Sequence, residues 1–513
     1  MELNLNNSSI STEKNIYEGT LEQGVDYEIN LPEYCNDILR ILKCQITPGI
    51  TSTNLVGDRV TIDGQTTIRL FYSDEGCKTV RCYEQIVPFS KAVDLSNNDC
   101  IAPQISVTCK VEYCNCRAIN QRRVDVHGAF SMGVRVCCQT PKNVLENCKG
   151  GGVQTKCSNK KVLGRIGGST RLFPLNEVFE IGQSKPTIKN IVNCYYSCVV
   201  TEYKVITNKI LVKGELKIKV LYCADNKEEE MCNIESVIPT SQIIDIDGID
   251  EGQITNVVMR AEAVNVIAKA DMNNELRLME VSGKLCVEVT AYENREIKVI
   301  NDAYSINNNL ICDKSSITMN TLLGTVSENV QSKHIINFGQ SEIKQVFDLF
   351  ISSVNSNFKI VSECIVIFGT LTVNILYADS DEKVSFIERA IDFEYNTKIM
   401  TKETAVSGSH TVIPVNLDYS IQDSSRIEVR IEQKIEALII GSENQTVISD
   451  IKIDQDNPKN DSSPTLTIYF AVENETVWEI ARKFNTTEEA IYAENELNGE
   501  VITRPLMLLI PGV

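Results

Sequence analysis

The sequence predicts a mainly β protein: three antiparallel β-rich repeats in tandem, followed by a small α+β (βααβ) module at the C-terminus. The repeats are recognised from Ile210–Tyr222, which alternates apolar with charged residues and returns as Val60–Tyr72 and Ile365–Tyr377. Alternation with a period of two places one set of side chains on each face of a strand. In every copy a glycine precedes a tyrosine by eight positions, and the glycines are 150 (214 − 64) and 155 (369 − 214) positions apart: Gly64 and Tyr72, Gly214 and Tyr222, Gly369 and Tyr377. Three copies at such even spacing indicate repeated units.

Each repeat is expected to open with a short apolar segment, Leu31–Cys44 in the first copy, where Ile38, Ile41 and Leu42 have the spacing of a helical turn. The signature strand, a polar turn and a second strand follow, and a further β-hairpin closes the unit. The glycine-rich Lys149–Val153 and the polar Asn301–Asn309 are expected to separate the copies. The predicted repeats span residues 20–148, 172–302 and 330–453.

The last sixty residues have a different pattern. Residues 454–464, DQDNPKNDSSP, are polar and rich in turn formers, which predicts a flexible linker. Beyond them Thr476 and Glu479 form one capping-box pattern, and Thr486 and Glu489 form a second. The predicted module, residues 465–513, is a strand, two helices and a strand: Thr465–Val472, Thr476–Phe484, Thr486–Asn495 and Leu506–Ile510.

Composition excludes several classes of function. The 513 residues carry a net charge of −19, whereas nucleic acids and anionic membranes attract a basic surface. No window approaches eighteen apolar residues, so no membrane insertion is expected. The N-terminus has no basic or apolar signal-peptide region, so the chain is expected to stay in the compartment where it is made.

Catalytic chemistry is not indicated. The three histidines, His127, His334 and His410, are far apart in the sequence, and no hydrolase, zinc-protease or phosphate-loop motif is present. Scattered acidic residues single out no glycosidase pair. The sequence therefore predicts a protein that is not an enzyme and has no cofactor.

The nineteen cysteines leave three interpretations open. Cys109, Cys114, Cys116, Cys137 and Cys138 supply soft ligands of the kind that zinc prefers, but without the usual Cys-x-x-Cys spacing, and no metal site is assigned. A free thiol is also a small apolar core residue. Exposed thiols can instead form cross-links between chains once the surroundings become oxidising.

Parts of this chain resemble two known domain families. Tyr469–Ile491, with Glu494-Asn495 and Leu508–Pro511, resembles a LysM domain. The three Gly-x7-Tyr strands, Leu31–Cys44 and Arg117–Val126 resemble the SPOCS domain of spore-coat proteins. SPOCS repeats followed by LysM are typical of SPOCS-repeat/LysM spore coat morphogenesis proteins, the SipL type of Clostridia, with a looser counterpart in the Bacillus stage VI sporulation protein D.

This resemblance implies a non-enzymatic scaffold for endospore coat assembly. Such a protein is made in the mother-cell cytoplasm and recruited to the forespore surface, in the spore coat. The implied partners are a coat basement-layer protein, the stage IV sporulation ATPase, and other coat proteins. The alternative is a cell-wall or cortex protein that binds peptidoglycan through N-acetylglucosamine. A cell-wall hydrolase would need a catalytic domain, which the repeats do not offer.

The candidate partner- or glycan-binding groove is carried over from LysM domains, whose glycan cleft lies between the loop after the first strand and the loop after the second helix. This chain departs from the LysM pattern in both loops, losing the usual Pro-Gly at Glu473-Asn474 and a Gly-Gln at Pro505-Leu506. These departures, together with acidic flanks, favour a protein partner, and sugar binding stays open. The groove residues are Glu473, Asn474, Glu475, Thr476, Val477, Asn495, Leu497, Pro505 and Leu506.

Overall fold

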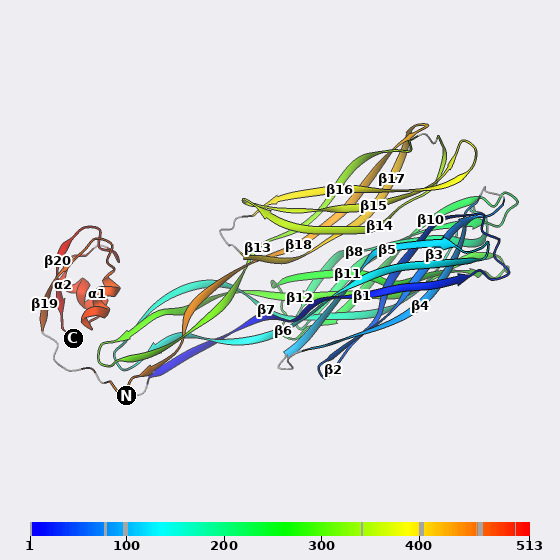
Figure 1. The fold of residues 1–513 in the computed structure, drawn as a ribbon. Coiled ribbons are helices and arrows are strands. Elements are labelled where there is room, and N and C mark those ends of the chain that lie inside the picture. The colour runs from blue at the N-terminus through cyan, green and yellow to red at the C-terminus, as the bar shows by residue number, and fades with distance from the viewer. Residues whose placement is uncertain are drawn as a thin grey trace.

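The protein is described from a computed structural model, which covers residues 3–75, 79–95, 101–339, 342–399, 405–457, 459, 465–497 and 499–512. Three repeats form an elongated body with a narrower stalk, and a small module sits at the far end of the stalk (Figure 1). Each repeat consists of two three-stranded antiparallel sheets, and the module has two strands and two helices. The mainly β class with a small α+β C-terminal module is therefore confirmed. Within the described residues, neither helix has the length and apolar character that crossing a membrane requires.

The three repeats share one strand order. In each, the first strand pairs with the last, the last with the fifth, and the signature strand lies in the middle of the second sheet. Repeat 1 contains β1 (Asn4–Asn30), β2 (Arg40–Val56), β3 (Arg59–Ser73), β4 (Arg81–Asp94), β5 (Ile101–Ala118) and β6 (Arg123–Lys149). Repeat 2 contains β7 (Val153–Glu180), β8 (Ile188–Ile206), β9 (Lys209–Ala224), β10 (Met231–Asp245), β11 (Ile254–Ala270) and β12 (Leu276–Ser305). Repeat 3 contains β13 (Leu310–Asn337), β14 (Ile343–Val361), β15 (Cys364–Asp379), β16 (Val384–Lys398), β17 (Ala405–Asp423) and β18 (Arg426–Ile453).

The glycine of each signature strand is required by a close approach of the neighbouring strand. A Cβ built on Gly64 would lie 2.6 Å from the carbonyl oxygen of Gly49, and one on Gly214 would lie 2.7 Å from that of Val199. An aromatic or Met side chain closes the other side, as Met259 does over Gly214. Because a backbone oxygen cannot yield, only glycine fits here, which explains why this residue recurs in each copy.

The signature strands are amphipathic at their first halves and buried on both faces at their ends. In β9, Val212, Leu216 and Val220 lie in the core between the two sheets of repeat 2. The opposite face was expected to meet solvent, but Leu221 is only 1% exposed. It packs in a central cluster with the equivalent residues of the other two signature strands, Phe71 and Leu376. The whole cluster consists of Phe71, Val80, Val192, Leu221, Cys223, Leu376 and Val384. The three repeats therefore meet around one common core.

Polar contacts join each repeat to the next at equivalent positions. Arg69 on β3 donates to the carbonyl oxygen of Cys194 in repeat 2, at 3.3 Å. Lys219, five residues after Gly214 as Arg69 is after Gly64, donates to the carbonyl oxygen of Leu349 in repeat 3, at 3.2 Å, and pairs with the buried Asp348 at 3.0 Å. At the corresponding place in repeat 3, Asn374 accepts a hydrogen bond from Lys43 of repeat 1. These contacts close the ring of repeats.

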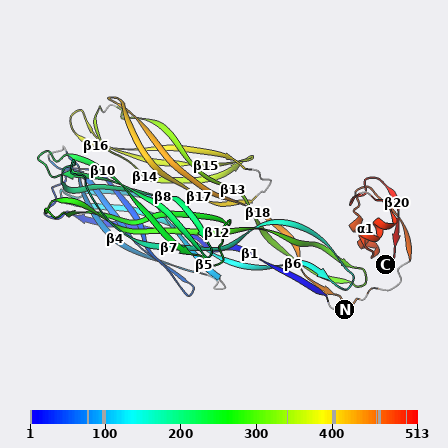
Figure 2. The ribbon, with the colours of Figure 1, turned by 180° about the vertical axis from the view of Figure 1, so that it is seen from behind.

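The stalk is built by the long edge strands that continue beyond the body. β1 with β6, β7 with β12 and β13 with β18 form three ladders (Figure 2). Their inner faces supply two further apolar clusters that contain residues from all three repeats: Ile10, Val144, Val162, Ile297, Val299, Ile317, Met319 and Val447, then Leu145, Cys148, Ile300, Ala303, Ile448 and Ile451. Because the predicted starts at residues 20, 172 and 330 fall inside these strands, we propose that the repeats extend over residues 3–149, 153–305 and 310–453.

One local expectation is wrong: Ile38–Leu42 forms no helical turn, because strand β2 begins at Arg40 and the Ile38 N–H donates to the carbonyl of Gln121 instead. Gly150–Gly152 lies between β6 and β7 as a tight turn at the tip of the stalk, with positive φ at all three glycines. Of the expected separating region 301–309, residues 301–305 belong to β12, where packing inside the stalk outweighs their polar character, and residues 306–309 lie between β12 and β13.

The C-terminal module has β19 (Leu466–Ala471), α1 (Val477–Phe484), α2 (Glu488–Glu494) and β20 (Leu506–Pro511). The first capping box is confirmed: the Thr476 hydroxyl accepts from the Glu479 N–H, and Glu479 accepts from the Thr476 N–H. The second is wrong, since Thr487 caps α2 by accepting from the Ala490 N–H. Thr486 is buried one position earlier, and its N–H donates to the carbonyl of Ala481.

Candidate binding site

The C-terminal module is held against the tip of the stalk. Asp302 of β12 accepts hydrogen bonds from the indole N–H of Trp478, at 2.9 Å, and from the Arg482 guanidinium, at 2.7 Å. The ring of Tyr304 meets the Trp478 ring edge to face with 4.9 Å between centroids, and its hydroxyl donates to the carbonyl of Thr486 at 2.7 Å. Tyr304 is thus a member of the apolar core of the module. Burial raises the pKa of its phenol above the ordinary range.

The predicted linker, residues 454–464, joins the repeats to the module and lies partly outside the described residues. Asp454 donates its N–H to the carbonyl of Asn309, and the ammonium group of Lys459 contacts the carbonyl of Ser305 and the side chain of Asn485. The expected flexibility of the segment stays a prediction. Whatever its mobility, the module has a defined seat on the stalk in this structure.

The two predicted groove loops lie side by side, and three of their residues stabilise the module itself. Glu475 accepts hydrogen bonds from the Tyr469 hydroxyl and the Val472 N–H, at 2.7 and 2.9 Å. Thr476 caps α1. Asn495 donates to the carbonyls of Ile491 and Leu509 and accepts from the Leu509 N–H, so it fastens the end of α2 to β20. These polar groups are already satisfied within the fold.

The remaining groove residues divide into core and surface. Val477 is 0% exposed and belongs to the core, so it is unable to serve as an exposed contact. Leu497 and Leu506 are half-buried against that core. The loop between them is fastened to the first loop by backbone hydrogen bonds from Asn474 to Ile502 and from Ile502 to Glu475, both 2.8 Å. Three groove residues are exposed: Glu473, Asn474 and Pro505.

A larger exposed feature lies on the other side of the module and was not assigned to a site by the sequence reasoning. The inner face of the two-stranded sheet packs on the helices through Ala471, Leu508 and Ile510. We call the opposite side of this sheet the outer face. Its side chains are apolar and 50–71% exposed: Leu466, Ile468, Phe470, Val472 and Met507. The alternation of Leu466, Ile468, Phe470 and Val472 was visible in the sequence, but the direction in which it points depends on where the helices pack.

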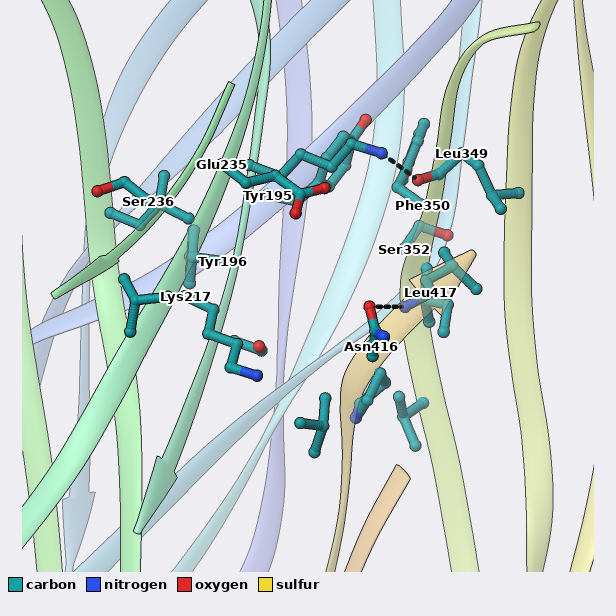
Figure 3. A pocket seen from close by; sticks show the side chains of 18 of the residues that line it. Tyr195, Tyr196, Lys217, Glu235, Ser236, Leu349, Phe350, Ser352, Asn416 and Leu417 are labelled. Carbon is teal, nitrogen blue, oxygen red and sulfur yellow. Dashed lines mark hydrogen bonds between the residues drawn. The ribbon is translucent and has the colours of Figure 1, made fainter. Parts of the chain in front are cut away.

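The body contains cavities where repeats meet. One, of about 400 Å³, lies between repeats 2 and 3 and is lined by Tyr195, Lys217, Phe350 and Asn416, among others (Figure 3). Tyr195 stacks on Phe350 with 3.8 Å between ring centroids, and burial raises the pKa of its phenol well above 10. Lys219 also lines the cavity, and its ammonium group donates to the carbonyl of Leu349 at 3.2 Å. Glu235 is the one acidic residue of this lining.

The histidines do not assemble into a site. His127 on β6 pairs with Asp26 at the surface, His410 on β17 meets the ring of Phe358, and His334 lies on β13. Burial lowers the pKa of His334 and of His410, which favours their neutral forms. Within the described part of the chain, no group of three or more His, Cys, Asp or Glu residues has an arrangement that would hold a metal ion.

The cysteine residues named in the sequence separate into two strands. Cys109, Cys114 and Cys116 lie on β5, whereas Cys137 and Cys138 are buried on β6. The seventeen cysteines of the described residues are all free thiols. Burial raises the pKa of Cys109 to about 12 and that of Cys137 to about 12, so both stay protonated at neutral pH.

The repeats are therefore expected to stay folded without disulfides or metal. Each has a core of its own, exemplified by the one around Leu216 and Val220. In excess reductant and chelator, the far-ultraviolet circular dichroism spectrum and the thermal midpoint should match those of the untreated protein. A loss of β signal with reductant would reveal structural disulfides, and a loss with chelator alone would reveal a structural metal.

Together, the fold and the site define a class: a modular β-repeat protein that presents a small binding module at the end of a stalk. The comparisons with known families agree with this. The family described as SipL, SPOCS domain, matches residues 37–119 and 187–269, and the LysM domain family matches residues 472–503. The domain composition is that of a SipL-like SPOCS/LysM sporulation protein, and both domain types are non-catalytic. No curated protein and no solved structure matches significantly.

Repeat 3 lies outside the matched residues. It nevertheless has the strand order of the two matched repeats and the same glycine-to-tyrosine signature, Gly369 to Tyr377. Its body sheet also closes the contacts with repeat 1 through Asn374 and Lys43. We therefore treat repeat 3 as a third, more divergent copy of the same fold.

Proposed function

We propose that this protein is a non-enzymatic scaffold for endospore coat assembly, recruited to the forespore surface by docking of its LysM domain onto a coat basement-layer protein. One observation carries the proposal: the outer face of the LysM sheet is apolar and exposed, on a domain seated at the end of the stalk. Apolar patches of this kind are typical of protein interfaces.

The arrangement of the domain favours the outer face over the groove as the docking surface. Phe470 is 71% exposed and stands opposite Met507 across the sheet, so a large aromatic and a flexible Met side chain are adjacent. Aromatic and Met side chains are enriched at the centres of interfaces. By contrast, the polar side chains of Glu475 and Asn495 are engaged inside the domain. The helical side faces the stalk through Trp478.

The partner and the compartments are taken from the resemblance. A SipL-like scaffold would be made in the mother-cell cytoplasm and bind the stage IV sporulation ATPase of the basement layer at the forespore surface. Other coat proteins would bind along the repeats. The body and stalk support this role, because the LysM domain lies at the far end of the stalk, away from the body (Figure 1).

A matched pair of substitutions tests the docking surface. Ile468→Asp on the outer face should weaken binding to the basement-layer protein at least tenfold, because it places a charge in the apolar centre of the interface. Ile243→Asp, on β10 of the body, changes an isoleucine with nearly the same exposure, 61% against 60%, and should bind like wild type. Both variants should keep the wild-type melting temperature. Equal binding by the two would exclude the outer face as the docking surface.

Peptidoglycan binding is the second candidate function, and the LysM match is the observation that favours it. It predicts that micromolar protein is retained on purified peptidoglycan. It also predicts that Ile468→Asp leaves retention unchanged, because the sugar-binding groove of LysM domains lies at the loops around Asn474 and Pro505. Retention of this kind, with unaltered binding to the basement-layer protein, would replace the docking proposal by a cortex- or wall-anchoring function.

A further inference from the structure

Three thiols meet between the two sheets of repeat 1. Cys44 on β2 is 7% exposed and lies in the core between the sheets, and Cys114 and Cys116 on β5 are half-buried against the same core. Cys44 interacts with both Cys114 and Cys116, and this interaction shifts the pKa of all three thiols. Cys44 therefore has a thiol neighbour at each of two inward-facing positions of the opposite sheet.

Two features of the backbone bring these thiols together. A β-bulge between Val111 and Tyr113 shifts the alternation of β5, so that Cys114 and Cys116 turn toward the core like the residues before the bulge. Opposite Cys114, β6 has Gly128, where a Cβ would lie only 3.2 Å from the Ile46 side chain and 3.5 Å from the Cα of Cys114. The missing side chain lets the two sheets approach at this point.

We propose that Cys44, Cys114 and Cys116 form a thiol–disulfide exchange site, in which a low-molecular-weight disulfide oxidises the protein and leaves a Cys44–Cys114 bond joining the two sheets. Cys114 attacks the disulfide, forms a mixed disulfide and releases the first small thiol. Cys44 gives its proton to the Cys116 thiolate and attacks the Cys114 sulfur, and the second small thiolate leaves and takes up that proton from Cys116. Two protein thiols and one small disulfide thus become one protein disulfide and two small thiols.

The electrostatic surroundings assign these roles. The hydrogen bond from Cys44, and also the Lys43 ammonium group, lower the pKa of Cys114 and so favour its nucleophilic thiolate. The same hydrogen bond lowers the pKa of Cys116, which has no comparable cation beside it. The pKa of Cys44 is raised by its two thiol partners and by burial, so it stays protonated until an acceptor takes its proton. Cys114 lies on β5, an edge strand of its sheet, and its side chain is only partly buried.

The other repeats supply matched controls, because they have no such trio. Cys44 pairs with Leu70 across the sheet. The equivalent pair is Cys194 with Val220 in repeat 2 and Leu349 with Ile375 in repeat 3. The position of Cys116, opposite Val126, is that of Val266, opposite Val281. Cys116→Val and Cys44→Leu therefore introduce residues that the same fold already accommodates.

The test treats full-length protein with oxidised glutathione, blocks the remaining thiols and maps disulfides by peptide mass spectrometry. Wild type should form the Cys44–Cys114 bond, and its thermal midpoint should rise by several degrees and fall again with reductant, because the bond closes a loop of 70 residues (114 − 44). Cys44→Leu should instead retain glutathione on Cys114, since the resolving thiol is gone. Cys116→Val should form the same bond more slowly.

Cys194→Leu is the control at the equivalent position of repeat 2 and should leave the Cys44–Cys114 bond unchanged. The proposal is overturned if wild type accumulates glutathione on Cys114 without a bond to Cys44. It is also overturned if disulfides form between chains or among other cysteines while Cys44 and Cys114 stay reduced. In those cases the three thiols would be core residues only.

Discussion

Leu221→Asp should separate the three repeats. Leu221 is 1% exposed in the central cluster, where it packs with Phe71 and Leu376 from the other two signature strands. The substitution removes an apolar side chain and leaves a charge without a partner in this cluster, which we expect to cost about 4 kcal/mol. The core between the two sheets of repeat 2 does not contain Leu221, so β structure should persist while the contacts between repeats are lost.

The measurement is the radius of gyration by small-angle scattering, together with the rate of limited proteolysis between repeats. Both should increase in the Leu221→Asp variant. Ile243→Asp is the control in the same sheet, on a side chain that is 61% exposed, and should behave like wild type. An unchanged scattering profile for Leu221→Asp would mean that the repeats do not share a central core. The simple alternation of the signature strand predicts that outcome, since it assigns Leu221 to the solvent face.

Tyr304→Ala should release the LysM domain from the stalk. The substitution removes the ring that packs on Trp478 and the hydroxyl that donates to the carbonyl of Thr486. Loss of a buried aromatic from a small core should destabilise the LysM domain by about 3 kcal/mol. Among the polar contacts that remain, the ion pair of Asp302 with Arg482 is half exposed and contributes little by itself, and Asp302 still accepts from the Trp478 indole N–H.

The single tryptophan of the chain makes this prediction directly measurable. Trp478 is 6% exposed in the docked domain, so its fluorescence should shift to longer wavelength when Tyr304→Ala lets water reach the ring. Tyr203→Ala, on an exposed tyrosine of β8, should leave the emission unchanged. Identical spectra for all three proteins would show that the LysM core does not depend on the stalk. Binding of the basement-layer protein should survive in Tyr304→Ala if the domain stays folded, because the outer face is on the opposite side of the sheet.

A docked LysM domain changes the geometry of scaffolding. A domain on a flexible linker would search a volume around the repeats, whereas a seated domain presents Ile468 and Phe470 in a fixed direction. Figures 1 and 2 show the sheet of the domain on the side away from the body. The partner would therefore bind the outer face at the end of the stalk, and the length of the stalk would separate the repeats from the basement layer.

The sequence by itself determined the units of this protein. Strict alternation in Ile210–Tyr222 and its copies identified strands, and Gly64, Gly214 and Gly369 identified three repeats, because a strand with one buried face leaves a period-two record in the chain. The capping box of Thr476 and Glu479 identified the first helix, because a cap depends on residues only three positions apart. The absence of clustered catalytic motifs pointed away from enzymatic function for the same local reason.

Only the tertiary structure decided how the units are combined. The burial of Leu221, the contact of Tyr304 with Trp478 and the meeting of Cys44 with Cys114 each join residues that are tens to hundreds of positions apart. The local periodicity of the sequence does not predict such contacts. An apolar residue has the same identity in the sequence whether its side chain faces its own core, a neighbouring repeat or solvent. The outer face shows the same limit: the alternation of Leu466, Ile468 and Phe470 is plain in the sequence, but its exposure follows from the helices covering the other side of the sheet.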